Sequence, residues 1–219
     1  MKLLAFDASS PACSCALYLD GEITERYEIA PRQHAALILP MADELLTEAG
    51  LKPIELEGIT FGRGPGSFTG LRIASGVAQG IAFAADIPVA PISSLATLAQ
   101  AAYIEKGAQK VLAAIDARMS EVYWGMYVID KQGIMRCEGE ESVSAPHHIS
   151  LPSTEDWYGV GSAWTIYADI LAKKCGLSQE GESYPQARAM IPLALAAFAE
   201  EQIVSAENAL PVYLRNKVV

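Results

Sequence analysis

The opening residues alternate between strand-like and turn-like patterns. A short apolar run at 3–6 stops at Asp7 and is followed by turn residues. Residues 12–19 and 22–29 then have the pattern of strands, and the Asp-Gly pair between them is typical of a hairpin. The chain is therefore predicted to open with three antiparallel strands.

Helical spacing follows these strands. Apolar residues recur every three or four positions from Ile38 to Ala49, and Gly50 provides a C-terminal stop. Pro40 lies inside this pattern, so the helix either starts near Leu39 or is kinked there. The elements expected next are a strand at 58–62, a helix at 71–85, a strand at 88–92 and a helix from 93 to about 105.

After residue 107 the order of elements begins again. Strands are expected at 110–115, 121–129 and 133–140, followed by an irregular stretch at 142–154. The remaining elements are a strand at 157–160, a helix at 163–175 and a final helix at about 188–203. The tail at 211–215 is apolar enough to dock on the fold.

Some residues of the first half reappear in the second at one constant offset. The pairs are Leu3 and Leu112, Ala5 and Ala114, Asp7 and Asp116, Ala8 and Ala117, and Tyr18 and Tyr127. Because the order of strand, Asp turn and strand recurs with them, we interpret the chain as two related halves. The predicted class is α/β, a duplicated ribonuclease-H-like fold whose two lobes place the paired Asp turns at a cleft.

The lobes have predicted boundaries. Residues 1–106 are expected to form the N-terminal lobe, and residues 107–187 the C-terminal lobe. The last helix and the tail, about 188–219, are expected to pack back on the N-terminal lobe.

Composition narrows the functional classes. The chain has 219 residues, 16 basic against 26 acidic, and a formal net charge of −10. This balance argues against a free-standing nucleic-acid binder, which usually carries a basic face. No apolar run approaches the roughly 20 residues of a membrane helix, and four cysteines form no disulfide framework. We expect a soluble cytoplasmic protein without a membrane segment.

The glycine-rich loop at 62–70 is the most distinctive segment. It joins a strand to a helix, a favourable context for anion binding, but it matches neither the Walker nor the dinucleotide fingerprint. Three interpretations stay open: a tight turn needing close backbone approach, a docking surface, and a phosphate contact. The candidate residues for a nucleotide or docking loop are Asp7, Arg63, Gly64, Gly66, Phe68, Gly70 and Arg72.

The helix after this loop carries two stripes of small residues. Ala74, Ala78 and Ala82 form one stripe, and Gly76, Gly80 and Ala84 form the other. Almost no charge interrupts residues 73–85, so the helix is buried on more than one side, in its own core or against a partner. The residues predicted for a partner interface are Leu39, Met41, Leu45, Ala74, Ala78, Ile81 and Ala82.

No convincing catalytic constellation emerges. The three histidines offer no pair four residues apart on a helix, and the cysteines form no zinc set. Asp7 and Asp116 follow strands and could hold a metal–phosphate unit, although a role as turn acceptors is favoured. The sequence therefore predicts no catalytic residue and no metal of its own.

The segment 62–72 resembles the TsaB family, also called YeaZ, together with Asp7-Ala8-Ser9, the helix around 34–50, Ser93-Ser94-Leu95 and Tyr213-Leu214-Arg215. The resemblance covers essentially the whole chain. That family is similar in fold to the sugar kinase, Hsp70 and actin superfamily. It belongs to the bacterial machinery that puts threonylcarbamoyl on the adenosine beside the anticodon of certain tRNAs.

The resemblance implies a non-catalytic scaffold or activator subunit. Its expected partners are TsaD, as a heterodimer, and the ATPase TsaE, with a homodimer when the chain is alone. The resemblance implies that the metal and threonylcarbamoyl-AMP bind TsaD and that ATP binds TsaE. Where TsaD would have its histidine pair, residues 93–98 of this chain offer no metal ligand. The family interface uses the first two helices, and tRNA is expected to bind only through the complex.

Two alternatives stay open. One is a nucleotide-dependent enzyme of the same superfamily, using Asp7, Asp116 and the glycine-rich loop around a metal–nucleotide. The other is a glycoprotease-like peptidase acting on TsaD.

Overall fold

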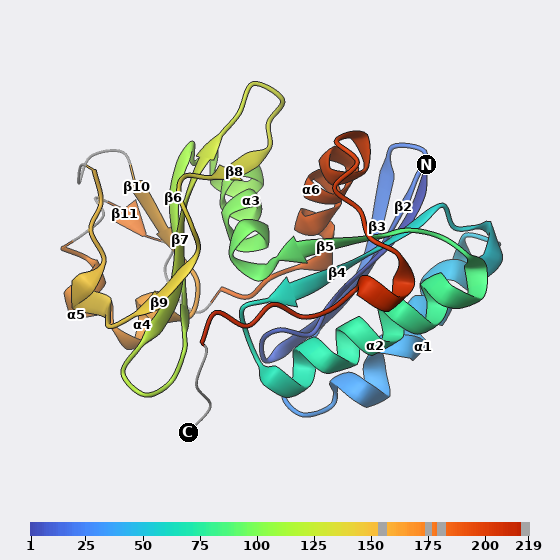
Figure 1. The fold of residues 1–219 in the computed structure, drawn as a ribbon, viewed down its shortest axis with the longest axis horizontal. Helices are drawn as coiled ribbons and strands as arrows, with labels where there is room; N and C mark the ends of the chain where they lie inside the picture. The colour runs from blue at the N-terminus through green and yellow to red at the C-terminus, as the bar shows by residue number, and fades with distance from the viewer. Residues whose placement is uncertain (153–156, 174–176, 179–182, 216–219) are drawn as a thin grey trace.

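The computed structural model describes residues 1–152, 157–173, 177–178 and 183–215, and shows two sheets with helices on their faces (Figure 1). The first sheet has the order β3-β2-β1-β4-β5. Its strands are β1 (Lys2–Asp7), β2 (Ala12–Leu19), β3 (Glu22–Ile29), β4 (Gly58–Gly64) and β5 (Val89–Ser93).

Alternating side chains of the first sheet bury two separate cores. Leu4 and Phe6 on β1 pack under α1 (His34–Glu48) and α2 (Phe68–Ala85). Leu3 and Ala5 point to the opposite face, because side chains alternate along a strand, and pack under α6 (Ala187–Ala199). The first sheet is therefore covered by helices on both faces.

The second sheet has the order β11-β10-β6-β7-β8, with β9 paired to β7. Its strands are β6 (Lys110–Asp116), β7 (Val122–Ile129), β8 (Met135–Cys137), β9 (Ser142–Ser144), β10 (Trp157–Val160) and β11 (Leu177–Ser178). The helix α3 (Ser94–Lys106) packs on one face, and α4 (Ala163–Ile166) with α5 (Ala168–Leu171) on the other. Short 3₁₀ turns lie at Pro53–Glu55, Pro146–His148 and Ala206–Asn208.

The two sheets repeat one topology. In each, three antiparallel strands are followed by two that run parallel to the first, so β1 to β5 correspond to β6, β7, β8, β10 and β11. This is the predicted duplicated ribonuclease-H-like fold.

The register of the strands corrects one of the expected pairs. Leu3 lies opposite Tyr18, whereas the corresponding Leu112 lies opposite Met126 and not Tyr127. A shift of one residue turns a side chain to the other face of a sheet, so the two tyrosines are not equivalent. The register reveals a different pair instead: Gly58 lies opposite Leu3, and Gly159 lies opposite Leu112.

Several element boundaries differ from those expected. The helix α1 begins at His34 rather than near Leu39 and contains Pro40, whose exposed position lets water satisfy the carbonyl that loses its partner. The expected helix at 163–175 is two short helices separated at Tyr167, and its end lies outside the described residues. The last helix ends at Ala199, and residues 142–144, expected to be irregular, form β9.

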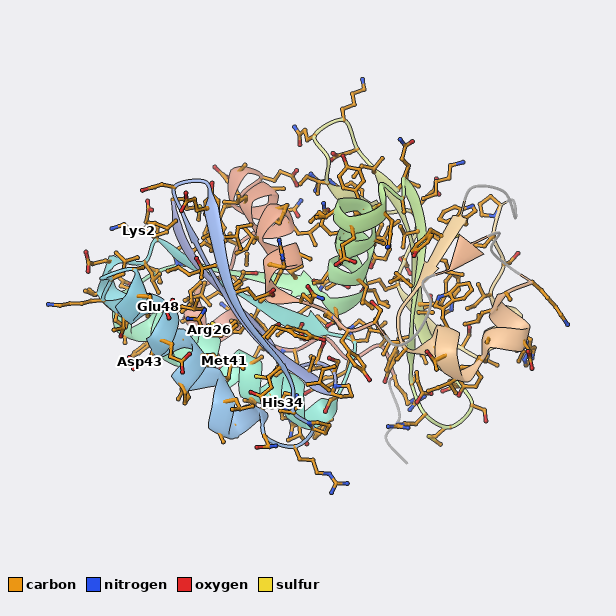
Figure 2. All side chains as sticks on the ribbon, turned by 180° about the vertical axis from the view of Figure 1, so that it is seen from behind. Lys2, Arg26, His34, Met41, Asp43 and Glu48 are labelled. Carbon is orange, nitrogen blue, oxygen red and sulfur yellow. The ribbon has the colours of Figure 1, made fainter. Side chains whose placement is uncertain are left out.

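An arginine on the edge strand fastens α1 to the first sheet. Arg26 on β3 points toward Glu48 on α1 (Figure 2) and forms an ion pair with it. Its Nε also donates to Glu44 at 3.2 Å. The polar edge strand is thus covered by a helix and charged side chains, which hinder its pairing with a strand of another molecule.

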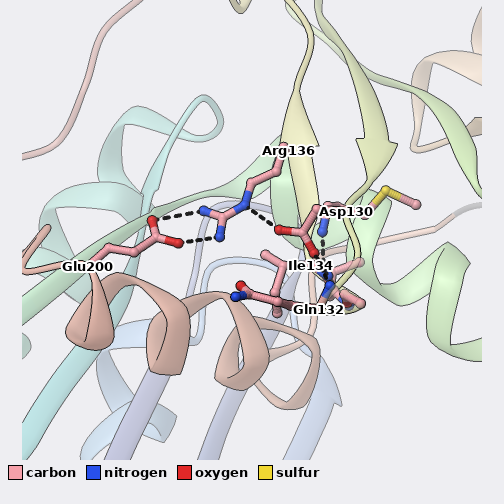
Figure 3. Close-up of polar contacts among 8 residues, drawn as sticks. Asp130, Gln132, Ile134, Arg136 and Glu200 are labelled. Atoms are coloured by element: carbon pink, nitrogen blue, oxygen red, sulfur yellow. Dashed lines mark hydrogen bonds and ion pairs between the residues drawn. The ribbon is translucent and has the colours of Figure 1, made fainter.

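A second arginine joins α6 to the second sheet. Arg136 on β8 donates from Nε to Asp130 at 2.9 Å and binds Glu200, just after α6, with its other two nitrogens (Figure 3). Partial burial would raise the pKa of Asp130, but hydrogen bonds from Arg136 and from the Ile134 and Gln132 amides outweigh it and lower that pKa. A further pair, Arg63 with Glu141 at 3.9 Å, also joins the two sheets.

Candidate functional site

The first Asp turn is buried. Asp7 has no exposed surface, and its Oδ1 accepts hydrogen bonds from the Ser9 amide at 2.9 Å and the Ser9 hydroxyl at 2.8 Å. Its Oδ2 has no hydrogen-bond partner among the described residues, and neither has the nearby Ser94 hydroxyl. Burial raises the pKa of Asp7 to about 7, although the hydrogen bonds from Ser9 act in the opposite direction.

The glycines of the 62–70 loop let the backbone close over this turn. A Cβ on Gly62 would lie 2.1 Å from Asp7 Oδ2, and one on Gly70 would lie 1.7 Å from the Ala8 carbonyl oxygen. A Cβ on Gly66 would lie 2.3 Å from the Ser9 carbonyl oxygen, which accepts a hydrogen bond from the Ser67 amide at 2.7 Å. Of the three interpretations, close backbone approach explains these glycines directly.

Gly64 has a different role. Its φ of +107° lies in the region that favours glycine, and a Cβ there would meet a Leu71 methyl at 2.9 Å and the Val212 carbonyl oxygen at 3.0 Å. The preceding residue, Arg63, accepts a hydrogen bond at its carbonyl from the Val212 amide at 2.8 Å. The loop therefore also forms the surface on which the C-terminal tail packs.

Phe68 and Arg72 form the exposed end of the loop with the tail. The Arg72 guanidinium lies 3.8 Å from the centre of the Phe68 ring, and Tyr213 packs on that ring with centroids 5.6 Å apart. Arg72 Nε donates to the Tyr213 hydroxyl at 3.3 Å. The predicted docking of residues 211–215 is therefore observed at this point, and Figure 1 shows the red tail running from beside α2 back toward the second sheet.

A cleft of about 490 Å³ lies between the two halves. The first half contributes the turn after β1, the start of α1 and the start of α2, and the second half contributes the turn after β6. Residues that line it include Ser9, Ser10, Arg32, His34, Gly66, Ser67, Phe68, Asp116, Arg118, Tyr123, Ser162 and Tyr184. Asp7 is not among them, so only one of the two predicted Asp turns presents its carboxylate to the cleft.

Asp116 is the carboxylate that faces the cleft. Its Oδ1 accepts from the Arg118 amide at 3.1 Å and the Tyr167 hydroxyl at 3.2 Å, and Arg118 lies 3.3 Å from its Oδ2. Arg118, Met119 and Ser120 all have positive φ, at 59°, 56° and 59°. Such a conformation costs roughly 1–2 kcal/mol per residue and persists only where contacts fix it. Here the C-terminal tail helps, because Arg215 contacts both Met119 and Glu121.

His34 is a structural residue of the cleft wall. Its Nε2 lies 2.9 Å from the Ser10 carbonyl oxygen and 3.2 Å from that of Ala12. Two carbonyl acceptors define Nε2 as the protonated donor, which ties the start of α1 to the first turn. Within the described ranges, no group of three or more histidine, cysteine or acidic side chains has a metal-binding arrangement.

The burial of side chains on α1 and α2 differs from what the predicted partner interface requires. Met41, Leu45, Ala74, Ala78 and Ala82 are at most 8% exposed, because they pack on the first sheet. Leu39 is 52% exposed, and Ile81 is partly buried. On α2 the accessible small-residue stripe is therefore the second one, with Gly76, Gly80 and Ala84, rather than the alanine stripe that we expected to meet a partner.

A hydrophobic side chain stands on this accessible side. Phe83 is 77% exposed, and together with Gln79, Gly80 and Glu207 it lines a shallow hollow between α2 and the C-terminal segment. A second hollow along the same helix lies beside Gly76 and Leu210. Apart from adjacent residues and the backbone of α2 itself, no described atom lies within 4 Å of a Cβ built on Gly76 or Gly80, so this side of α2 can approach another backbone closely.

These features define a class: a duplicated ribonuclease-H-like protein in which a glycine-rich loop covers the first Asp turn. The model of the family described as "tRNA N6-adenosine threonylcarbamoyltransferase" (TsaD) matches residues 23–213. The TsaB protein of Escherichia coli K12 is 44% identical, over 100% of this chain and 96% of its own length. The TsaB protein of Haemophilus influenzae is 41% identical, over 100% and 95%. The chain belongs to the TsaB family of tRNA threonylcarbamoyladenosine biosynthesis proteins.

A solved structure agrees with this assignment. YeaZ from Pseudomonas aeruginosa has a TM-score of 0.93 and 47% identity, covering 97% of this chain and 99% of that one. Within the part of the chain that is described, no helix combines the length and apolarity needed to cross a bilayer.

Proposed function

We propose that this chain is a non-catalytic accessory subunit of the machinery that forms threonylcarbamoyladenosine in tRNA. It pairs with a TsaD-type catalytic subunit and with TsaE in the cytoplasm, and forms a homodimer when alone. The metal and threonylcarbamoyl-AMP bind TsaD, ATP binds TsaE, and tRNA is held through the complex. The observation that carries the proposal is the full-length similarity to TsaB proteins.

The geometry supports a role in binding a partner subunit rather than in catalysis. The outer side of α2 combines the exposed Phe83 ring with the open positions Gly76 and Gly80, which suits close packing against another helix. Leu39 on α1 adds an exposed apolar side chain. Asp7, by contrast, is shielded from the cleft, and its pKa of about 7 reflects burial without a cation.

Light-scattering chromatography with purified TsaD tests the pairing. Gly80→Arg adds a long charged side chain where the isolated chain has open space, so the variant folds but no longer forms the heterodimer. Ile104→Arg is the matched control, because Ile104 is 50% exposed on α3, away from α1 and α2. Loss of the heterodimer in Gly80→Arg alone supports the proposal. An intact heterodimer in Gly80→Arg, or none with the parent chain, contradicts it.

A further inference from the structure

The cleft between the halves has a charge that differs from the rest of the chain. Acidic residues outnumber basic ones by 26 to 16 overall. Among the described residues that line the cleft, however, Asp116 is the only carboxylate and pairs with Arg118, while Arg32 provides a second guanidinium group, which leaves the lining with one excess positive charge. One arginine comes from each half of the chain, and both are exposed at the rim of the cleft. The cleft is therefore suited to an anion.

Arg32 and Arg118 both have an uncommon backbone conformation. Arg32 has a φ of 69° and Arg118 a φ of 59°, in the left-handed region that few non-glycine residues adopt. The neighbouring His34 fixes the first segment to the Ser10 carbonyl, and Asp116 fixes the second through the Arg118 amide. Such conformations concentrate at sites that bind ligands, because there the surrounding contacts must aim particular side chains.

Aromatic side chains lie beside these cations. Phe68 lines the cleft, is 49% exposed and carries the Arg72 guanidinium on its ring, and Tyr123 lines the opposite wall. Arginines interleaved with exposed aromatic rings are typical of surfaces that bind single-stranded nucleic acid, where phosphates meet the cations and bases stack on the rings. An acidic protein segment would use the cations but would gain nothing specific from the rings.

We propose that this cleft contacts a single-stranded segment of RNA, with Arg32 and Arg118 on its phosphates and Phe68 against a base. The inference rests on the proposed function, which brings tRNA to the complex. Two phosphate contacts are too few to hold RNA against a net charge of −10, so the contact acts within the assembled complex.

The test measures binding of unmodified tRNA to the assembled complex between 50 and 200 mM salt. Replacing both arginines by glutamine, Arg32→Gln with Arg118→Gln, weakens binding about tenfold. It also lowers the slope of log affinity against log salt by about 1.4, because each single-strand phosphate contact contributes about 0.7. Arg32→Lys with Arg118→Lys keeps both charges and restores most of the slope.

Lys131→Gln is the matched control. Lys131 is exposed at the far end of β7 from Arg118, roughly 25 Å away at about 3.3 Å per residue, and its loss leaves affinity within twofold. Unchanged affinity and slope in the double glutamine variant would overturn the inference. So would loss of the heterodimer in that variant, which would assign the cleft to a protein segment.

A competition arm separates RNA from a free nucleotide. Millimolar AMP leaves tRNA binding unchanged if the cleft takes RNA. Weakening by AMP in the parent complex, but not in the double glutamine variant, would assign the cleft to free nucleotide and overturn the inference. The heterodimer is measured in the same samples, so its absence with the parent chain identifies failure of the proposed function, on which this inference depends.

Discussion

The two Asp turns share a position in the duplicated topology and have opposite surroundings. Asp7 ends β1 and is fully buried, with Ser9 as its partner and one carboxylate oxygen without any among the described residues. Asp116 ends β6, is 10% exposed, and holds Arg118 at the cleft. The same strand and turn thus produce an internal packing element in one half and a cleft-facing carboxylate in the other.

The difference arises from what covers each turn. In the first half, Gly62, Gly66 and Gly70 allow the loop after β4 to press on Asp7, Ala8 and Ser9. In the second half, the chain after β10 reaches the turn through side-chain hydrogen bonds: the Ser162 hydroxyl accepts from the Asp116 amide at 3.2 Å, and the Tyr167 hydroxyl donates to Asp116 Oδ1 at 3.2 Å. The backbone of the glycine-rich loop therefore covers the buried Asp7 turn.

The largest expected effect comes from disrupting the close packing of the glycine-rich loop on the Asp7 turn. Gly70→Ala places a methyl group against the Ala8 carbonyl, where the rigid backbone has no space, and costs about 3 kcal/mol or more in free energy of unfolding. Gly76→Ala, on the open side of the same helix, stabilises by about 0.5–1 kcal/mol because alanine restricts the unfolded chain. Urea unfolding of both variants checks the pair. Equal stabilities of the two variants would show that the glycine-rich loop does not depend on close backbone approach to the Asp7 turn.

The next effect is the pH dependence of Asp7. Its folded pKa of about 7 lies above the ordinary 3.8, so the native state binds the proton more tightly. This contribution to stability is fully present below pH 3.8 and is lost as the pH rises through 7, at about 1.4 kcal/mol per pH unit between the two pKa values.

Asp7→Asn has no proton to lose at this site. It should therefore unfold at higher urea than the parent chain at pH 8, and the difference should shrink toward pH 5. Urea midpoints measured across this range decide the matter. A constant difference between the two chains would show that Asp7 does not titrate there.

The smallest effect belongs to Asp116. Asp116→Asn loses the ion pair with Arg118, whose side chain is 86% exposed, but keeps an oxygen for the Arg118 amide and the Tyr167 hydroxyl. Exposed pairs of this kind contribute less than about 1 kcal/mol. Thermal unfolding of the variant within a few degrees of the parent is expected. A loss as large as that of Gly70→Ala would make the second turn as structural as the first.

Much of the architecture was predictable because it follows from alternation and from the repeated Asp turn. The opening meander, the restart after residue 107 and the glycine-rich loop before α2 all lie close to their expected places. The orientation of α2 was not predictable. Its two stripes consist of alanine and glycine, which differ little in hydrophobicity, so the pattern could not decide which stripe faces the sheet.

The cleft was predictable only in part. Asp116 was expected there, but Arg32 was not, because an arginine in the sequence does not indicate the positive φ that directs this one to the cleft. Burial of Asp7 was missed for a related reason. The close approach of Gly62 and Gly66 depends on contacts between strands far apart in sequence, which local patterns do not contain.

The central claim is that neither Asp turn performs chemistry, and activity of the reconstituted complex tests it most directly. Threonylcarbamoyl transfer to unmodified tRNA would be measured with TsaD, TsaE and either the parent chain, Asp7→Asn or Asp116→Asn. The account predicts no activity from this chain alone and rates within about threefold of the parent for both variants. A loss of a hundredfold or more in a variant that still forms the heterodimer would contradict it.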